Sequence, residues 1–344
     1  MIARKKILFT ILLFLSIALP GCGPSAGEGT APSNALTSTD PTQPPAIAPT
    51  STPVPLPPSD TPEPSPTPWL ELSGSGGGVI AFVSERSGSP VIYLMNADGS
   101  DQRQLTNQYD VHPDWSPDGQ TLAFGTHRET IGSIYLYDMK THSERQLTFT
   151  DRTTSAPDWA PGGTRLSFIY TPTHPGINYE IFLMNSSGES FKRLTDSTEY
   201  QHYANPDWSP DGRQIAYSAD IDDVYNIYKM DPDGTNIVQL TAGERNNNKP
   251  AWSPDGSKIA FETNRDGNWE IYVMNADGSN LMRLTDHPDD DKWPSWSPDG
   301  SRIAFQSDRD GNWEIYLMNA EGSDPIRLTE NKAKDSEPAW KPVN

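Results

Sequence analysis

The residues of this chain that could bind an ion are concentrated in one acidic run near the C-terminus. The run DHPDDDK spans 286–292, and its Asp289, Asp290 and Asp291 offer carboxylate oxygens of the kind that Ca²⁺ prefers. A solvated acidic surface loop has the same composition, and we favour that interpretation. No cofactor is therefore predicted, and Ca²⁺ bound at this run is the alternative.

The histidines and the known catalytic motifs do not point to an active site. The chain has six histidines, and no two of them stand at a spacing that is typical of a metal site. The sequence contains no G-x-S-x-G, no H-E-x-x-H and no glycine-rich phosphate loop between a strand and a helix. We therefore predict that the protein is not an enzyme and has no metal site.

Most of the chain consists of a sequence repeat, so the repeated elements must position any functional site. Related segments such as PDWSPDG and PAWSPDG surround Trp115, Trp159, Trp208, Trp252, Trp296 and Trp340, at spacings of 44, 49, 44, 44 and 44 residues. The first five segments are followed by a short apolar run such as KIAF and a second such as EIYVMN, and each unit closes with QLT or RLT. Short apolar runs separated by Gly, Pro, Asp and Asn are typical of β-strands.

Four short strands in each period predict one blade of a β-propeller. The first unit begins with the second strand of a blade, Val79–Ser84, and the last unit, Glu337–Asn344, supplies only a first strand. Joined, the two chain ends complete a sixth blade. We therefore predict an all-β, six-bladed β-propeller over 79–344, built of four-stranded antiparallel blades and closed by the C-terminal strand joining the N-terminal blade.

The repeat W-S-P-D-G…I-A-F…I-Y-L-M-N-A-D-G…R-L-T resembles that of the TolB-like six-bladed β-propellers. The resemblance covers Val79–Asn344, and it implies that the strand carrying each Trp lies nearest to the propeller axis. It does not imply a role in the Tol system, because a leader and a Pro-rich stretch stand where TolB has an α/β domain.

The two faces of the predicted ring differ in how much the repeats vary. Because neighbouring strands are antiparallel, the SPDG and NADG turns fall on one face, the turn face, and the longer connections fall on the other, the variable face. Binding residues tend to lie in variable loops on a rigid scaffold. The residue before the proline of each Trp segment should lie at the channel mouth on the variable face, which makes candidate binding residues of His112, Asn205, Lys249, Trp293 and Glu337, with Ala156 at the sixth position. Solvated loop ends that vary freely are the alternative interpretation.

The residues before the propeller have the features of a lipoprotein. A basic patch and an apolar run precede Leu19–Cys22, which resembles a bacterial lipobox, so 1–21 is predicted to be a lipoprotein signal peptide and Cys22 to be lipidated. Cys22 is the only cysteine, which excludes an internal disulfide. Residues 22–78 are rich in Pro, Thr and Ser and are predicted to form a disordered stalk.

Charge and composition narrow the class of partner. The formal net charge is −20, which argues against nucleic acid, since binding it needs a basic surface. We predict a lipid-anchored, monomeric propeller that binds a protein partner in the cell envelope, for example a basic one. Its location would be the outer membrane or periplasm of a two-membrane bacterium, or the surface of a single-membrane one. A glycan or small-ligand receptor, with aromatic residues of the variable face stacking on sugars, is the alternative, followed by a lyase-like propeller that acts on polysaccharides.

Overall fold

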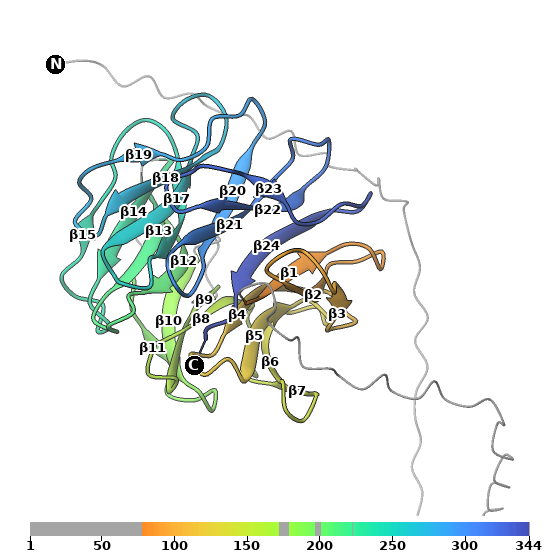
Figure 1. Cartoon of the computed structure of the whole chain (residues 1–344). Helices are drawn as coiled ribbons and strands as arrows, with labels where there is room; N and C mark the ends of the chain where they lie inside the picture. Colours follow the sequence, from red (N-terminus) through yellow and green to blue (C-terminus); the bar gives the residue numbers. More distant parts are fainter. Residues whose placement is uncertain (1–77, 172–178, 197–200, 222, 344) are drawn as a thin grey trace, which may run out of the picture. The chain divides into compact units, whose positions relative to one another are not determined.

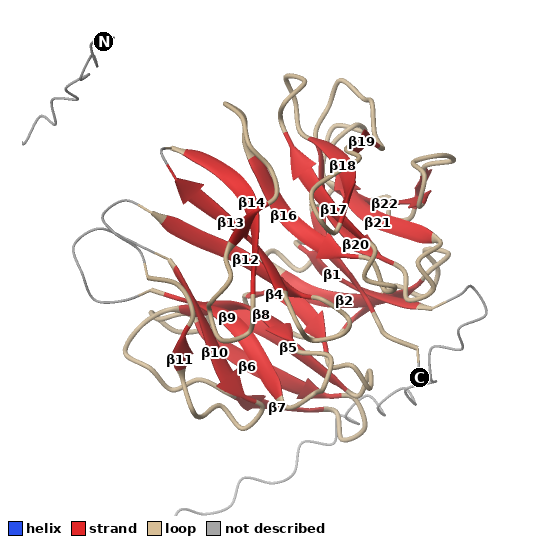
Figure 2. Cartoon of the chain, turned by 90° about the vertical axis from the view of Figure 1, so that its left-hand side faces the viewer, coloured by secondary structure: helices blue, strands red, loops and turns tan. Residues whose placement is uncertain are grey.

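The described part of the chain consists of strands and loops arranged around one axis (Figures 1 and 2). The computed structural model describes residues 78–171, 179–196, 201–221 and 223–343. Within these ranges, six antiparallel sheets of four strands each form a propeller, and no helix is present. No segment of the described ranges is thus a helix that could cross a membrane.

The strands fall into six blades that are numbered here from the N-terminus. Blade 1 consists of β24 (Asp335–Trp340), β1 (Val79–Ser84), β2 (Val91–Asn96) and β3 (Arg103–Gln104). Blade 2 consists of β4 (Asp110–Trp115), β5 (Thr121–Thr126), β6 (Ser133–Asp138) and β7 (Ser143–Gln146). Blade 3 consists of β8 (Thr154–Trp159), β9 (Arg165–Tyr170), β10 (Glu180–Asn185) and β11 (Lys192–Arg193).

Blades 4 to 6 repeat this order along the chain. Blade 4 consists of β12 (His202–Trp208), β13 (Ile215–Ile221), β14 (Val224–Met230) and β15 (Val238–Gln239). Blade 5 consists of β16 (Asn247–Trp252), β17 (Lys258–Thr263), β18 (Glu270–Asn275) and β19 (Met282–Arg283). Blade 6 consists of β20 (Asp291–Trp296), β21 (Arg302–Ser307), β22 (Glu314–Asn319) and β23 (Ile326–Arg327).

The predicted closure of the ring is confirmed. The C-terminal β24 pairs antiparallel with the N-terminal β1, with Ile80 opposite Trp340 and Ser84 opposite Asp335. The innermost strands of successive blades contact one another in the order β4, β8, β12, β16, β20, β24 and back to β4. The first and last strands of the described chain are therefore part of one blade, and Figure 1 shows β24 beside β1.

Apolar residues of neighbouring blades form shared cores. One cluster joins Ile271 of blade 5 to Phe305 of blade 6, and another joins Ile315 of blade 6 to Phe82 of blade 1. All four of these side chains are fully buried. A four-stranded sheet has two apolar faces, and each face here is covered by an adjacent blade, so no blade can be stable alone.

The structure corrects the predicted extent of two strands in each blade. The innermost strand starts before the Pro of the Trp segment, so the residue preceding this Pro lies inside the strand rather than in a loop. The outermost strand ends before the Leu and Thr of QLT or RLT in all six blades. The Thr leaves the strand because its hydroxyl accepts a bond from the third strand, as Thr106 Oγ1 does from the Ile92 N–H at 3.0 Å.

The glycine of the third-to-fourth-strand turn brings adjacent blades into backbone contact. A Cβ atom built at Gly99 of blade 1 would lie 2.6 Å from the carbonyl oxygen of Leu328 in blade 6. Gly88, in another turn of the same blade, has a similar φ of 91° against 81° for Gly99, but nothing lies within 4 Å of its Cβ position. The turn face is thus uniform because its glycines are needed for blade packing.

We expect Gly99→Ala to lower the free energy of unfolding more than Gly88→Ala does. Both changes place a Cβ in the left-handed region, at about 1 to 2 kcal/mol each. Gly99→Ala should cost a further 1 to 3 kcal/mol or so, because its methyl group meets backbone of blade 6. Urea unfolding of the two variants measures the difference, and equal losses would contradict the role given to this contact.

Candidate functional site

Every innermost strand contains a β-bulge at the proline of its Trp segment. In β4 the pairing with β5 shifts between Val111 and Asp114, so His112 and Pro113 together face one residue of the partner strand. Proline cannot donate to the ladder, and a bulge is one of the few places where a strand accepts it. The residue before each proline has a positive φ, between 46° and 58°, at His112, Ala156, Asn205, Lys249, Trp293 and Glu337.

We call these six residues the pre-proline ring, and buried side chains hold several of them in this conformation. The Trp293 N–H donates to Glu262 Oε2 at 3.0 Å, and the Glu337 N–H donates to Gln306 Oε1 at 2.9 Å. Both acceptors are only 4% exposed and come from the second strand of the preceding blade. Left-handed conformations of residues other than glycine are unfavourable and persist where surrounding structure imposes them. The ring is therefore preorganised.

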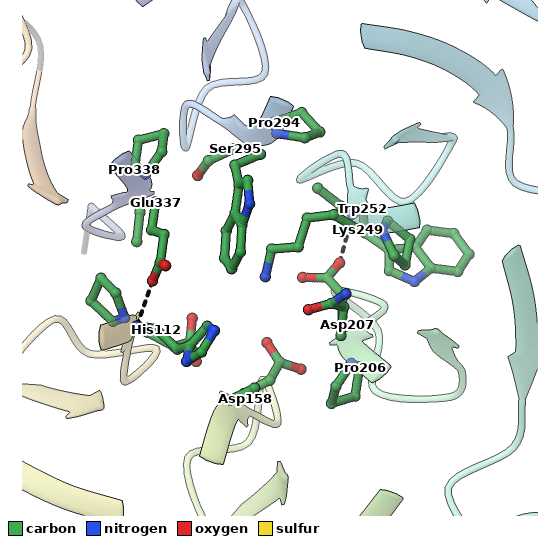
Figure 3. Close-up of a pocket in the computed structure, with 18 of the residues that line it drawn as sticks. His112, Asp158, Pro206, Asp207, Lys249, Trp252, Pro294, Ser295, Glu337 and Pro338 are labelled. Carbon is green, nitrogen blue, oxygen red and sulfur yellow. Dashed lines mark hydrogen bonds between the residues drawn. The ribbon is translucent and has the colours of Figure 1, made fainter. Parts of the chain in front are cut away.

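The pre-proline ring surrounds one cavity on the propeller axis (Figure 3). All six residues line this cavity of about 200 Å³, together with the prolines and the residues that follow them. The five candidate binding residues predicted from sequence thus lie together, one from each of five blades. We call this space the axial cavity.

Four members of the ring interact across the mouth of the axial cavity. The Lys249 ammonium lies 4.2 Å from the centroid of the Trp293 ring, and the His112 ring stacks on Trp293 with centroids 5.5 Å apart and an interplanar angle of 29°. The His112 N–H donates to Glu337 Oε2 at 2.7 Å. Lys249 forms no ion pair with any residue in the described ranges, and Figure 3 shows its amine pointing into the cavity. A lysine over an indole face is stabilised by cation–π attraction.

A second ring of residues, which the sequence analysis did not select, lies directly after the prolines. Its members are Asp114, Asp158 and Asp207 in blades 2 to 4, which we call the aspartate arc, and Ala251, Ser295 and Ala339 in the other three blades. The signal was visible in the sequence as the change from PDW to PAW and PSW. The carboxylates of Asp158 and Asp207 point into the axial cavity, as does the amine of Lys249 (Figure 3).

Each residue of the aspartate arc links its blade to the next. Asp114 Oδ2 accepts from the Trp159 N–H at 2.7 Å, and Asp207 Oδ2 accepts from the Trp252 N–H at 2.6 Å. Asp158 Oδ2 accepts in the same way from the Trp208 N–H at 3.0 Å. One oxygen of each carboxylate is thus structural, and Asp158 and Asp207 can present the other to the axial cavity.

Burial changes the proton affinity of the groups around the axial cavity. Burial, opposed in part by the hydrogen bond from Trp159, raises the pKa of Asp114 to about 7. Burial likewise raises the pKa of Asp207 to about 6, and burial together with repulsion from the other two carboxylates raises the pKa of Asp158 well above its usual range. Burial lowers the pKa of His112, so this imidazole is neutral at pH 7. The aspartate arc therefore exchanges protons near neutral pH.

The acidic run divides into residues with different surroundings. Asp291 is the buried first residue of β20 and forms an ion pair with Arg309 at 2.9 Å, so it is not part of an exposed loop. Asp290 pairs with Lys292 at 3.0 Å, and Asp289 lies 3.5 Å from His287. Across the described ranges, no group of three or more His, Cys, Asp or Glu side chains is placed to hold a metal ion.

The remaining variable-face residues lie apart from the axial cavity. Tyr109 and Tyr179 are exposed and contact His127 and His202, with ring centroids 5.3 Å apart in each pair. His174, Tyr200 and the predicted lipidation site Cys22 lie outside the described residues. The structure thus concentrates the predicted binding residues at the axis and leaves the outer aromatic residues as separate pairs.

Comparison with known families and structures identifies the repeats. The family description "TolB beta propeller domain" (PD40) matches residues 98–250 and 244–344. A search of curated proteins returned no match.

Solved structures share the fold at low identity. TolB from Acinetobacter baumannii is 24% identical with a TM-score of 0.68, and the match covers 77% of this chain and 67% of that one. A protein described as a TolB from Agrobacterium tumefaciens is 23% identical with a TM-score of 0.61, covering 78% and 99%. An oligogalacturonate lyase from Vibrio parahaemolyticus is 17% identical with a TM-score of 0.51, covering 73% and 74%. At these identities the likeness concerns the fold alone.

We expect Asp207→Ala and Asp207→Asn to affect stability in opposite ways. Asparagine keeps an oxygen for the Trp252 N–H, whereas alanine leaves this amide without its acceptor and should cost about 1 to 3 kcal/mol. Because the pKa of Asp207 is raised to about 6, the folded state binds the proton more tightly than the unfolded state, and stability falls as pH rises from about 4 to 6.

Asp207→Asn removes this titration. Its stability relative to wild type should therefore increase between pH 4 and 7, by on the order of 1 to 3 kcal/mol, since one pKa unit corresponds to about 1.4 kcal/mol. Urea unfolding at pH 4, 5, 6 and 7 measures both variants against wild type. A constant difference between Asp207→Asn and wild type would show that this carboxylate does not titrate in that range.

Proposed function

The chain belongs to the family of TolB β-propeller domains, and from this membership and the geometry of its axial cavity we propose that it is a protein-interaction platform. The platform is lipid-anchored, faces outward from the membrane and binds its partner through the variable face and the pre-proline ring. The observation that carries the proposal is the contrast between a constant scaffold and six different side chains on it. The bulge and the positive φ recur in all six blades, whereas no two pre-proline residues are alike.

The chemistry of the pre-proline ring suits recognition of another protein. The ring combines an aromatic side chain, two side chains of opposite charge, an imidazole and an amide within one preorganised circle. Rigid aromatic and charged anchors in a concave, partly desolvated site are typical of the residues that dominate protein–protein binding energy. The net charge of −20 favours a basic partner and salt-sensitive association.

The anchor is proposed from residues outside the described ranges. The lipobox-like Leu19–Cys22 supports lipidation of Cys22, and the Pro-rich 22–78 supports a stalk. An extended Pro-rich chain rises about 3.1 Å per residue, so this stalk reaches on the order of 150 Å. The propeller would then bind partners at a distance from its own membrane, in the periplasm or at the cell surface.

The contacts of Trp293 favour protein binding over glycan binding. Sugars stack on open aromatic faces, but Lys249 from blade 5 and His112 from blade 2 already contact the Trp293 ring. The lyase likeness supports the fold only, and the described ranges place no group of three or more metal-binding side chains together. We therefore propose a non-catalytic role.

Photo-cross-linking in the native host tests the face that binds. A photoreactive residue replaces Tyr109, which is 44% exposed on the variable face, or Glu321, which is exposed on the turn face. We expect one protein to be captured from position 109 and not from position 321. Trp293→Ala should reduce this capture at least fivefold, because it removes the ring that Lys249 and His112 contact at the mouth of the axial cavity. Raising the salt concentration moderately should also reduce capture, because salt screens attraction between charged surfaces.

The exposed turn face supplies the matched control. Glu337→Gln changes a carboxylate that accepts from His112 in the pre-proline ring, and Glu321→Gln makes the same chemical change on the turn face. Only Glu337→Gln should lower capture from position 109. Capture from position 321 alone, or capture that is insensitive to every ring variant, would refute the proposal.

A further inference from the structure

The axial cavity carries more acidic than basic groups, and this imbalance indicates the chemistry of a ligand that would fit it. We propose that the axial cavity binds an ammonium or guanidinium group through the free carboxylate oxygens of the aspartate arc. The inference rests on the proposed function, because it names the chemistry of the group that enters the same site.

The charges that face the cavity are few and can be counted by blade. Asp114, Asp158 and Asp207 come from blades 2, 3 and 4, and the cation that faces them is Lys249 of blade 5. His112 is neutral because burial lowers its pKa, and the Glu337 carboxylate accepts from the His112 N–H. With Glu337, four carboxyl groups thus line a cavity that one ammonium faces, and burying a charge without a partner is unfavourable.

The hydrogen-bond acceptors of the cavity also lack donors. In each residue of the aspartate arc, Oδ2 accepts from a Trp N–H of the next blade, and the Asp114 carboxylate also accepts from the backbone of Trp115. Among the described residues, no donor forms a hydrogen bond with Oδ1 of Asp158 or Asp207. The buried Nδ1 of His112, which also lines the cavity, has no partner within the described ranges. Several free acceptors around one space fit a group with several N–H donors, such as guanidinium with five or ammonium with three.

A metal ion fits this site less well than an organic cation does. The Lys249 ammonium points into the same cavity and would repel a divalent ion, and the described ranges contain no group of three side chains placed to hold a metal. Because Lys249 and His112 already contact the Trp293 ring, the carboxylates rather than this ring would bind the entering cation. At about 200 Å³ the cavity suits a group of side-chain size rather than a larger ligand.

The raised proton affinities of the aspartate arc agree with a site for a cation. Without enough positive charge, these carboxylates hold protons near neutral pH, as the pKa of about 7 for Asp114 indicates. An entering cation would replace a proton, so binding should release protons and strengthen from pH 6 to 8. Lys249, His112 and Glu337 are the other titratable groups that line the cavity, and Glu262 lies behind Trp293.

Calorimetric titration of the full-length protein with butylguanidinium tests the inference, with butylurea as its neutral isostere. We expect saturable binding of butylguanidinium and at least tenfold weaker binding of butylurea. Asp158→Asn should weaken butylguanidinium binding at least tenfold while keeping an oxygen for the Trp208 N–H, whereas Asp277→Asn on the exposed turn face should leave it unchanged. Thermal unfolding confirms that both variants are folded.

The Lys249→Met variant distinguishes a site where the aspartate arc binds a cation from a site where Lys249 binds an anion. Removing the resident ammonium removes a like charge that would repel the entering cation, so butylguanidinium should bind at least threefold more tightly to this variant. Absent binding, equal binding of butylurea, no effect of Asp158→Asn, or weaker binding to Lys249→Met would each overturn the inference.

Competition between butylguanidinium and the protein partner shows whether the cation is a side chain of that partner or a free small molecule. It also tests this inference separately from the proposed function. Release of the cross-linkable partner by butylguanidinium, and not by butylurea, would show that a Lys or Arg side chain of that partner enters the cavity. Binding of butylguanidinium without such release would assign the site to a free amine or guanidine. Capture of a partner without any butylguanidinium binding would overturn the inference and leave the proposed function intact.

Discussion

The whole structure depends on one constraint, which is that no backbone ladder connects one blade to the next. The hydrogen-bonded pairing stops at the edge of each four-stranded sheet, so side chains and close backbone contacts must hold six sheets in a ring. Three of these contacts are shared apolar cores, turn glycines against Leu carbonyls, and carboxylates that accept Trp amides. The first two recur around the ring and stabilise it. The third is confined to blades 2 to 4, and it places three carboxylates at the axis.

This constraint explains why the site lies where the copies differ. Positions that pack against a neighbouring blade cannot vary without opening the ring, as the contact between Gly99 and Leu328 illustrates. The pre-proline residues are the exception, because the bulge turns their side chains towards the axis and buried residues such as Glu262 and Gln306 hold their backbone. The scaffold thereby fixes the position of each side chain while leaving its chemistry free.

The fold could be predicted from the sequence almost completely, and the site only in part. Six Trp segments and an incomplete unit at each chain end were sufficient to predict the closed ring, because blade architecture is a local and repeated property. The aspartate arc escaped prediction because PDW looks like scaffold, and only the positions of Asp114, Asp158 and Asp207 on adjacent blades show that they share one space. The burial of Asp291 against Arg309 was equally invisible, since it depends on a partner 18 residues away.

The near-identical segments 265–279 and 309–323 show that the repeated residues form the scaffold, whereas the residues at the axis differ between blades. In both copies the Asn of RDGN binds carbonyl oxygens of the following connection, at 2.7 Å from Asn268 to His287 and at 2.8 Å from Asn312 to Ala333. The segments therefore shape the connections that lead to the axis without reaching it themselves. The two blades that share them nevertheless present Lys249 and Trp293 to the axial cavity, and these two residues contact each other. Identical scaffolds thus deliver unlike groups to one place, and this converts a symmetric ring into a site with an acidic side and an aromatic, cationic side.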